Sequence, residues 1–207
     1  PAITINRYCS SGLQSIAYAG ERIMLGQAET ILAGGVESMS QVPMMGHSIR
    51  PNALLAEQAP EYYMSMGHTA EQVAQKYQVT RQDQDAFAVR SHQKAAKALQ
   101  EGKFSDEIVP VDVTERRVGE QNQLEERQFT FSQDEGVRAG TTEEVLSTLR
   151  PAFSTKGTVT AGNSSQTSDG AACVMMMDRE KASSLSLQPL AKFRAFAVGG
   201  VPPEVMG

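Results

Sequence analysis

The chain has 207 residues, a formal net charge of −5 and 40% hydrophobic residues. This composition supports one or two folded domains with a hydrophobic core and excludes a globally disordered chain. Without a basic run, and with only two cysteines, the sequence argues against a nucleic-acid partner and a disulfide framework. No apolar stretch is long enough for a membrane span, and we expect a cytoplasmic protein.

The first 40 residues predict a strand, a helix and a second strand. The alternating run Ile3–Tyr8 favours a strand, and apolar residues at helical spacing favour a helix from about Ser10 to Leu25. Gly26 is placed to follow that helix as its C′ residue. Residues 30–35 form a short apolar run that ends in glycines, which is typical of a buried parallel strand and therefore predicts a βαβ unit.

The next stretch, residues 41–154, differs in composition and reads as an insertion between strands of one core. Helical patterns cover residues 69–77 and about 80–100, with Thr80 as the N-cap of the second helix and Gly102 after its end. Residues 108–111 contain a proline, which favours an edge strand. The polar residues 114–135 predict an exposed excursion.

The last stretch, residues 155–207, returns to core-like sequence. Residues 158–161 and 172–176 predict strands on either side of a loop of small residues, 162–170. A short helix is expected after Asp178, and a strand near residues 190–197.

Cys9 lies where the predicted first strand turns into the predicted first helix. The first N–H groups of a helix lack intrahelical partners and, with the positive end of the helix dipole, favour a thiolate. A thiolate there is a good nucleophile, and nearby amides can stabilise the oxyanion formed on a carbonyl. Most cysteines only pack in cores, and local spacing alone favours that structural interpretation.

Five motifs along the whole chain, taken together and in their order, reverse this preference. They are Asn6-Arg7-Tyr8-Cys9-Ser10-Ser11-Gly12-Leu13-Gln14, Ala33-Gly34-Gly35-Val36-Glu37-Ser38-Met39-Ser40, Met66-Gly67-His68-Thr69-Ala70-Glu71, Leu149-Arg150-Pro151-Ala152-Phe153 and Gly157-Thr158-Val159-Thr160-Ala161-Gly162-Asn163. The chain resembles the central part of a thiolase, an acetyl-CoA acyltransferase, from one end to the other.

The resemblance implies an α/β fold that is part of the thiolase fold. Residues 1–40 would belong to the amino-terminal core, 41–154 to an inserted loop domain over the acyl-CoA, and 155–207 to the return to the core and the start of the carboxy-terminal half. Thiolases continue with an Asn-Glu-Ala-Phe segment, a Gly-His-Pro segment and a second catalytic cysteine. We therefore expect this chain to be a piece of a larger protein.

The resemblance also assigns the site residues. Cys9 matches the residue that becomes acylated, Arg138 matches an arginine against the CoA adenine, Ser165 a serine that binds pantetheine, and Met66 a residue of the acyl-thioester channel. The sequence departs from thiolases at Ser65, where many have histidine, and at residues 166–168. The resemblance implies no metal and no cofactor besides CoA, which is a substrate.

The remaining cysteine and the histidines carry weaker signals. Cys173 lies in an apolar run and is expected to be an inert core residue. His47, His68 and His92 lack metal-ligand spacing. His92 falls among charged residues on a predicted helix, so we expect it to be solvated, and a structural role is favoured for His68.

The implied activity of the parent protein is cleavage of 3-oxoacyl-CoA with CoA, the thiolytic step of fatty-acid β-oxidation, by a homo-oligomer. Residues 41–47 resemble the degradative branch more than the biosynthetic one. The activating histidine and the second cysteine would lie outside this chain, so the isolated chain is expected to be inactive. Two alternatives remain open: a biosynthetic acetyl-CoA acetyltransferase, and a non-catalytic folding or interaction unit.

Overall fold

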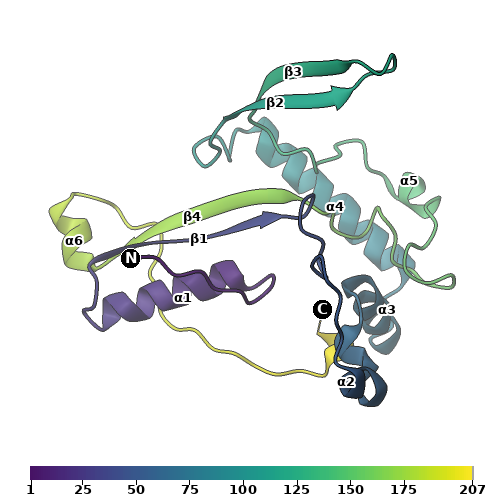
Figure 1. The fold of residues 1–207 in the computed structure, drawn as a ribbon, viewed down its shortest axis with the longest axis horizontal. Helices are drawn as coiled ribbons and strands as arrows, with labels where there is room; N and C mark the ends of the chain where they lie inside the picture. The colour runs from purple at the N-terminus through teal and green to yellow at the C-terminus, as the bar shows by residue number, and fades with distance from the viewer. Residues whose placement is uncertain (207) are drawn as a thin grey trace. The chain divides into compact units, whose positions relative to one another are not determined.

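The computed structural model describes residues 1–206, which form helices and strands in mixed order (Figure 1). They separate into two units, each built from segments that are distant in sequence. The first unit comprises Pro1–Leu55 and Thr167–Val201, and the second comprises Ala56–Gln166 and the segment that starts at Pro202. Helix α2 (Ala53–Gln58) contains the boundary between them.

The first unit is a helix on a two-stranded antiparallel sheet. It contains α1 (Ser11–Met24), β1 (Thr30–Ser38), β4 (Asp169–Met177) and α6 (Arg179–Ser184). Strand β1 pairs with β4 from Thr30–Met177 to Ser38–Asp169, and α1 runs alongside this pair in Figure 1. The buried apolar residues of these elements are small: Ala17 and Ala19 of α1, Ala33 of β1 and Ala182 of α6.

The predicted first helix is confirmed, including the way in which it ends. Gly26 has a φ of 68°, which glycine adopts without steric cost. Its N–H donates to the carbonyl of Ile23, and the next N–H, from Gln27, donates to the carbonyl of Arg22. These two bonds form a Schellman motif and satisfy carbonyls that the helix end leaves without partners.

Three strand predictions in this unit are wrong. Residues 3–8 form no strand within the described chain, and only an isolated bridge joins Arg7 and Cys9. The run 30–35 is a strand but pairs antiparallel rather than parallel, and most of β1 is exposed. Residues 190–197 are irregular, and Phe193 among them packs its ring against Gly20 of α1.

The second unit is mainly helical. Its elements are η1 (Pro60–Tyr63), α3 (Met66–Lys76), α4 (Arg81–Gln100), the strands β2 (Val111–Val118) and β3 (Leu124–Phe131), α5 (Glu143–Ser147) and η2 (Pro203–Val205). Helix α4 packs against α5, and η2 packs against α3. Unusually for a core, the two largest fully buried side chains described are threonines, Thr69 and Thr160.

Helix α4 begins and ends as its sequence predicts. Thr80 accepts a hydrogen bond from the N–H of Asp83, whose carboxylate accepts one from the N–H of Thr80. This reciprocal capping box satisfies two backbone donors at once. Gly102 follows the helix with a φ of 66°, so the prediction of both ends is confirmed.

The strand predictions for the second unit need correction in two places. The expected polar excursion 114–135 is exposed, but most of it forms the β2–β3 hairpin, whose strand begins at Val111 rather than at residue 108. Residues 158–161 form no strand, and only an isolated bridge joins Thr160 to Pro151. The N–H groups of Thr158 and Thr160 instead donate to the side chains of Glu71 and Asn163.

Candidate functional site

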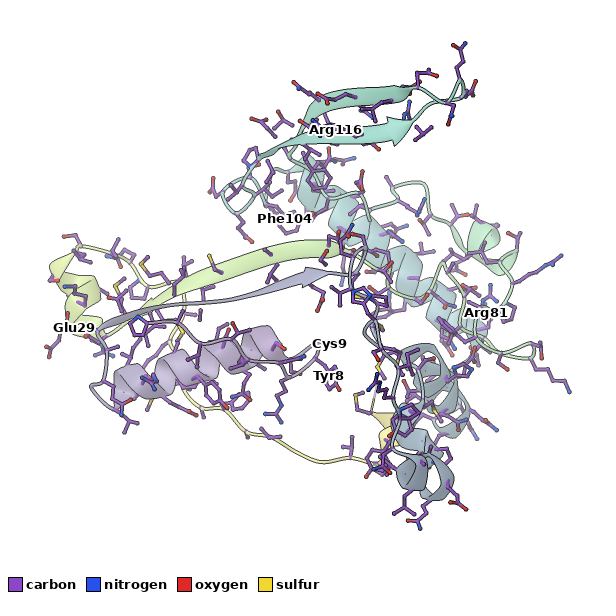
Figure 2. The ribbon with its side chains drawn as sticks, in the orientation of Figure 1. Tyr8, Cys9, Glu29, Arg81, Phe104 and Arg116 are labelled. Carbon is purple, nitrogen blue, oxygen red and sulfur yellow. The ribbon has the colours of Figure 1, made fainter. Side chains whose placement is uncertain are left out.

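Cys9 lies in a sharp turn immediately before α1, and its side chain is exposed. Tyr8 has a φ of 49°, which is uncommon for a residue with a side chain and costs conformational energy. Two side chains hold this backbone: Asn6 accepts from the N–H of Tyr8 at 2.9 Å, and Ser11 donates to the carbonyl of Tyr8 at 2.7 Å. Figure 2 shows Tyr8 and Cys9 together on the loop at the amino-terminal end of α1.

The start of α1 is suited to stabilising an anion. Ser10 is the N-cap of this 14-residue helix, but its side chain makes no capping hydrogen bond. The N–H of Ser11 donates to the carbonyl of Tyr8 at 3.0 Å, but the next N–H groups of the first turn have no intrahelical acceptor, and the helix dipole adds positive potential there. Space is also open beside them, since a Cβ added at Gly12 would meet no atom within 4 Å. The turn thus presents the sulfur of Cys9 to solvent at a favourable helix end.

Cys173 is exposed, so the prediction of a buried core cysteine is wrong. In the β1–β4 register it lies opposite Gly34, and directly opposed residues share a face of a sheet. The same face carries Leu32 and Met175, which are also exposed. The buried Ala33 belongs to the other face. An apolar run on a two-stranded sheet therefore leaves one face uncovered.

The loop that carries Ser165 begins with a carboxylate clamp. Glu71 of α3 accepts hydrogen bonds from the backbone N–H groups of Thr158, at 2.9 and 3.0 Å, and of Val159, at 2.9 Å. Thr158 also receives a bond on its hydroxyl from the side-chain amide of Gln84, at 2.9 Å. Bonds to a charged acceptor are stronger than neutral ones, so helix α3 fixes the start of this loop.

A second set of bonds fixes the middle of the same loop. Asn163 accepts from the N–H of Thr160 at 2.7 Å and donates to the carboxylate of Asp85 at 2.9 Å. Asp85 is buried on α4 and forms an ion pair of 2.7 Å with Arg81. Arg81, labelled in Figure 2, also donates to the carbonyls of Leu146 and Leu149.

Ser165 and Arg138 lie on neighbouring segments of the second unit. The side chain of Gln166, the residue after Ser165, lies directly against Gly136, two residues before Arg138. Both candidate side chains are exposed. The N–H of Arg138 donates to Nδ1 of His92 at 3.2 Å, so His92 is a half-buried acceptor rather than the solvated histidine that we expected.

Met66 is the first residue of α3, and its side chain is 37% exposed. The residues around it form a hydrogen-bonded pair, in which the hydroxyl of Ser65 lies 2.8 Å from Nδ1 of His68. The ring of His68 meets that of Phe153 edge to face. An open depression of about 580 Å³ adjoins this helix start, lined by Pro60, Glu61, Tyr63, Met64, Ser65, His68 and Gln72.

The structure thus groups some of the sequence-predicted site residues. It brings the segments of Arg138 and Ser165 together in the second unit, which also contains Met66, whereas Cys9 belongs to the first unit. Sequence reasoning missed the backbone of Tyr8 and the role of Asp85, for which no signal exists in one sequence. Glu71 and Asn163 lie within the thiolase-like motifs, but the motifs alone do not indicate which bonds these side chains make. Among residues 1–206, no three His, Cys, Asp or Glu side chains are grouped to hold a metal ion.

Comparison with known sequences identifies the family. Residues 1–180 match the family described as thiolase, N-terminal domain. The whole chain aligns with the 3-ketoacyl-CoA thiolase of Bacillus subtilis (strain 168) at 77% sequence identity, and the alignment covers 53% of that protein. It also aligns with a probable acetyl-CoA acyltransferase of Staphylococcus aureus (strain COL) at 42% identity, and this alignment covers 54% of that protein. The chain therefore spans about half the length of these curated relatives.

Solved structures agree with the sequences. The dimeric peroxisomal thiolase of Saccharomyces cerevisiae matches 98% of this chain with a TM-score of 0.82 and 39% identity, over 50% of its own length. The acetyl-CoA acetyltransferase of Bacillus anthracis matches 98% with a TM-score of 0.78 and 40% identity, over 52% of its length. The expected partial thiolase α/β fold is thereby confirmed, and the chain belongs to the thiolase family through its amino-terminal domain.

Proposed function

We propose that this chain carries the nucleophile of a degradative thiolase, which cleaves 3-oxoacyl-CoA with CoA into acetyl-CoA and a shortened acyl-CoA. The observation that carries the proposal is the exposed Cys9 in a strained turn at the start of α1. Local strain is retained where surrounding contacts impose it, and such positions cluster at active sites. The name of the 77% identical relative, 3-ketoacyl-CoA thiolase, supports the same activity.

The reaction would proceed in two covalent steps. The sulfur of Cys9 attacks the 3-oxo carbon of the substrate, the bond between its second and third carbons breaks, and a proton added to the second carbon gives acetyl-CoA. The acyl group remains on Cys9 as a thioester. The sulfur of a second CoA then attacks that thioester, releasing acyl-CoA and the cysteine thiolate. Covalent catalysis divides one difficult step into two easier ones.

The proton transfers need groups that our assignment does not place in this chain. A histidine would activate Cys9, and a second cysteine would act as acid and base. Both would come from the remainder of the full-length protein. The isolated 207-residue chain would accordingly turn over no substrate, because catalytic residues that act as a unit do not replace one another.

The second unit would hold CoA. Arg138 would stack on the adenine, Ser165 would bind the pantetheine and Met66 would line the acyl channel. An exposed guanidinium can stack on a planar ring, and an exposed hydroxyl can donate to an amide. The full-length protein would be a cytoplasmic homo-oligomer. Among the described residues, no helix is long and apolar enough to cross a membrane.

The biosynthetic reaction is the second candidate function. It is favoured by the likeness to the Bacillus anthracis protein, which is named acetyl-CoA acetyltransferase. The two candidates differ in the acyl chain that they accept. A purely structural role, in which Cys9 has no chemistry, is the remaining alternative.

One kinetic experiment separates these functions. Loss of the 3-oxoacyl-CoA enolate absorbance is followed with CoA present, for acetoacetyl-CoA and for longer substrates, with the full-length protein and its Cys9→Ala variant. A degradative thiolase cleaves the longer substrates at comparable or higher kcat/KM and loses the activity with Cys9→Ala, while Cys173→Ala retains it. Activity confined to acetoacetyl-CoA indicates the biosynthetic type. Full activity in the Cys9→Ala variant refutes both the degradative and the biosynthetic assignment, since each needs Cys9 as the nucleophile.

A further inference from the structure

One buried ion pair on α4 holds two segments of the second unit. Arg81 binds the carboxylate of Asp85 through Nε at 2.7 Å, and its Nη2 donates to the carbonyls of Leu146, at 2.5 Å, and Leu149, at 3.1 Å. The side chain of Asp85 is only 6% exposed. A buried carboxylate in this setting needs further donors to offset its lost hydration.

Asn163 supplies the donor that completes the set. Its amide donates to the second oxygen of Asp85 at 2.9 Å and to the carbonyl of Thr158 at 3.1 Å, while its own oxygen accepts from the N–H of Thr160. Both polar atoms of the side chain, the amide oxygen and the amide nitrogen, are therefore engaged. Thr160 is 0% exposed, so water does not compete for the bond that its N–H donates to Asn163.

Asn163 stands only two residues before Ser165 in the chain. The hydroxyl of Ser165 has one weak bond, to the carbonyl of Gln166 at 3.3 Å, so its position depends on the backbone that precedes it. Ser164 reinforces that backbone by donating to the carbonyl of Thr160 at 2.6 Å. Thus hydrogen bonds hold the loop up to Ser164, and the Ser165 hydroxyl, with its one weak bond, can exchange that bond for one to a ligand.

We propose that Asn163 is a positioning residue for coenzyme A: anchored on the Arg81–Asp85 pair, it holds the Ser165 hydroxyl where it meets the pantetheine. This inference rests on the proposed function, because it takes CoA as the ligand. Asn163 does not contact the ligand itself. Its contribution is preorganisation, since a hydroxyl already in place loses less entropy on binding.

A double-mutant cycle tests the inference by measuring the dissociation constant of CoA by calorimetry on the full-length protein. Asn163→Ala weakens binding about threefold to fivefold, near the value of the single hydrogen bond lost when Ser165→Ala is made. In the Ser165→Ala background, Asn163→Ala changes binding less than about twofold, because the two residues act through one contact. If Asn163→Ala weakens CoA binding by the same factor in the wild type and in the Ser165→Ala variant, the proposal is overturned, because a general structural role of Asn163 would weaken binding in both proteins.

Controls separate this outcome from misfolding and from failure of the proposed function. Gln121→Ala removes an exposed amide from the hairpin turn and leaves binding unchanged. If Asn163→Ala does not fold, Asn163→Ser replaces it, since its hydroxyl can still accept from Thr160 but is too short to reach Asp85 as well. If the wild-type protein binds CoA but cleaves no 3-oxoacyl-CoA, the proposed thiolase activity is refuted, while the double-mutant cycle still tests the role of Asn163. A wild type that binds no CoA refutes both.

Discussion

Asp169 accepts two hydrogen bonds from Ser40, one from its hydroxyl and one, at 2.8 Å, from its backbone N–H. These bonds join the residue that opens β4 to the turn that follows β1. The hydroxyl of Ser40, then its N–H, and to a lesser degree the N–H of Met39, lower the pKa of the Asp169 carboxyl from its ordinary 3.8, against a small desolvation that raises it. The charged form is therefore preferred in the folded protein.

The first prediction concerns the pH dependence of this link. A carboxyl whose folded pKa lies below its unfolded value stabilises the protein above the unfolded pKa, and the contribution disappears as the pH falls through the folded pKa. Ser40→Ala should therefore lower the free energy of unfolding near pH 7 more than at about pH 2 to 3. Urea denaturation at both pH values measures this. An equal difference at the two pH values would show that Asp169 does not respond to Ser40.

The second prediction concerns Gly34, which has no room for a side chain. A Cβ there would lie 2.7 Å from the carbonyl oxygen of Ala172 and 2.9 Å from the Cβ of Cys173. Gly34→Ala should lower the free energy of unfolding by roughly 1–3 kcal/mol, because the β1–β4 pair must shift. Gly170→Ala is the matched control in the same sheet, since a Cβ there meets no atom within 4 Å. Denaturation midpoints that fall equally for both variants would contradict the close approach.

A third prediction tests the assignment of Arg138. Its guanidinium is exposed, and stacking of an exposed cation on a ring contributes about 0.5–1 kcal/mol. Arg138→Ala should raise the dissociation constant of CoA by up to about fivefold and leave that of a CoA analogue without the adenine nucleotide unchanged. Arg179→Ala, at an exposed arginine of α6, serves as the control. Equal weakening of both ligands by Arg138→Ala would refute the adenine contact.

The fourth prediction compares the two cysteines, both of which are exposed. Only Cys9 adjoins the amino-terminal end of a helix, where an attacking anion is stabilised. Iodoacetamide should therefore modify Cys9 faster than Cys173, although access no longer separates them as the sequence suggested. Peptide mapping over a time course gives the two rates. Faster labelling of Cys173 would remove the physical basis for Cys9 as the nucleophile.

The helices could be predicted from the sequence because their signals are local. Thr80 is the predicted N-cap of α4, and Gly26 and Gly102 follow their helices as predicted, each with a positive φ. The strands could not be predicted as well, since pairing depends on distant partners. Residues 158–161 have a strand-like pattern, yet Glu71 and Asn163 take the N–H groups that a strand would offer to a neighbour.

The candidate site likewise has features that the local sequence predicts and features that only the folded structure shows. Cys9 before the helix start follows from local pattern and from the resemblance to thiolases. The left-handed backbone of Tyr8 could not be read from its residue type, because tyrosine rarely adopts it. The Asp85–Asn163 bond joins residues 78 positions apart, so only the folded chain reveals it.

The central claim is that Cys9 becomes acylated, and mass spectrometry tests it most directly. Full-length protein is mixed with a 3-oxoacyl-CoA in the absence of free CoA, quenched in acid and digested. The peptide containing Cys9 should gain the mass of the shortened acyl group, added CoA should remove that mass, and Cys9→Ser should abolish the gain. Acylation of Cys173 instead, or turnover by the Cys9→Ser variant, would show that Cys9 is not the nucleophile.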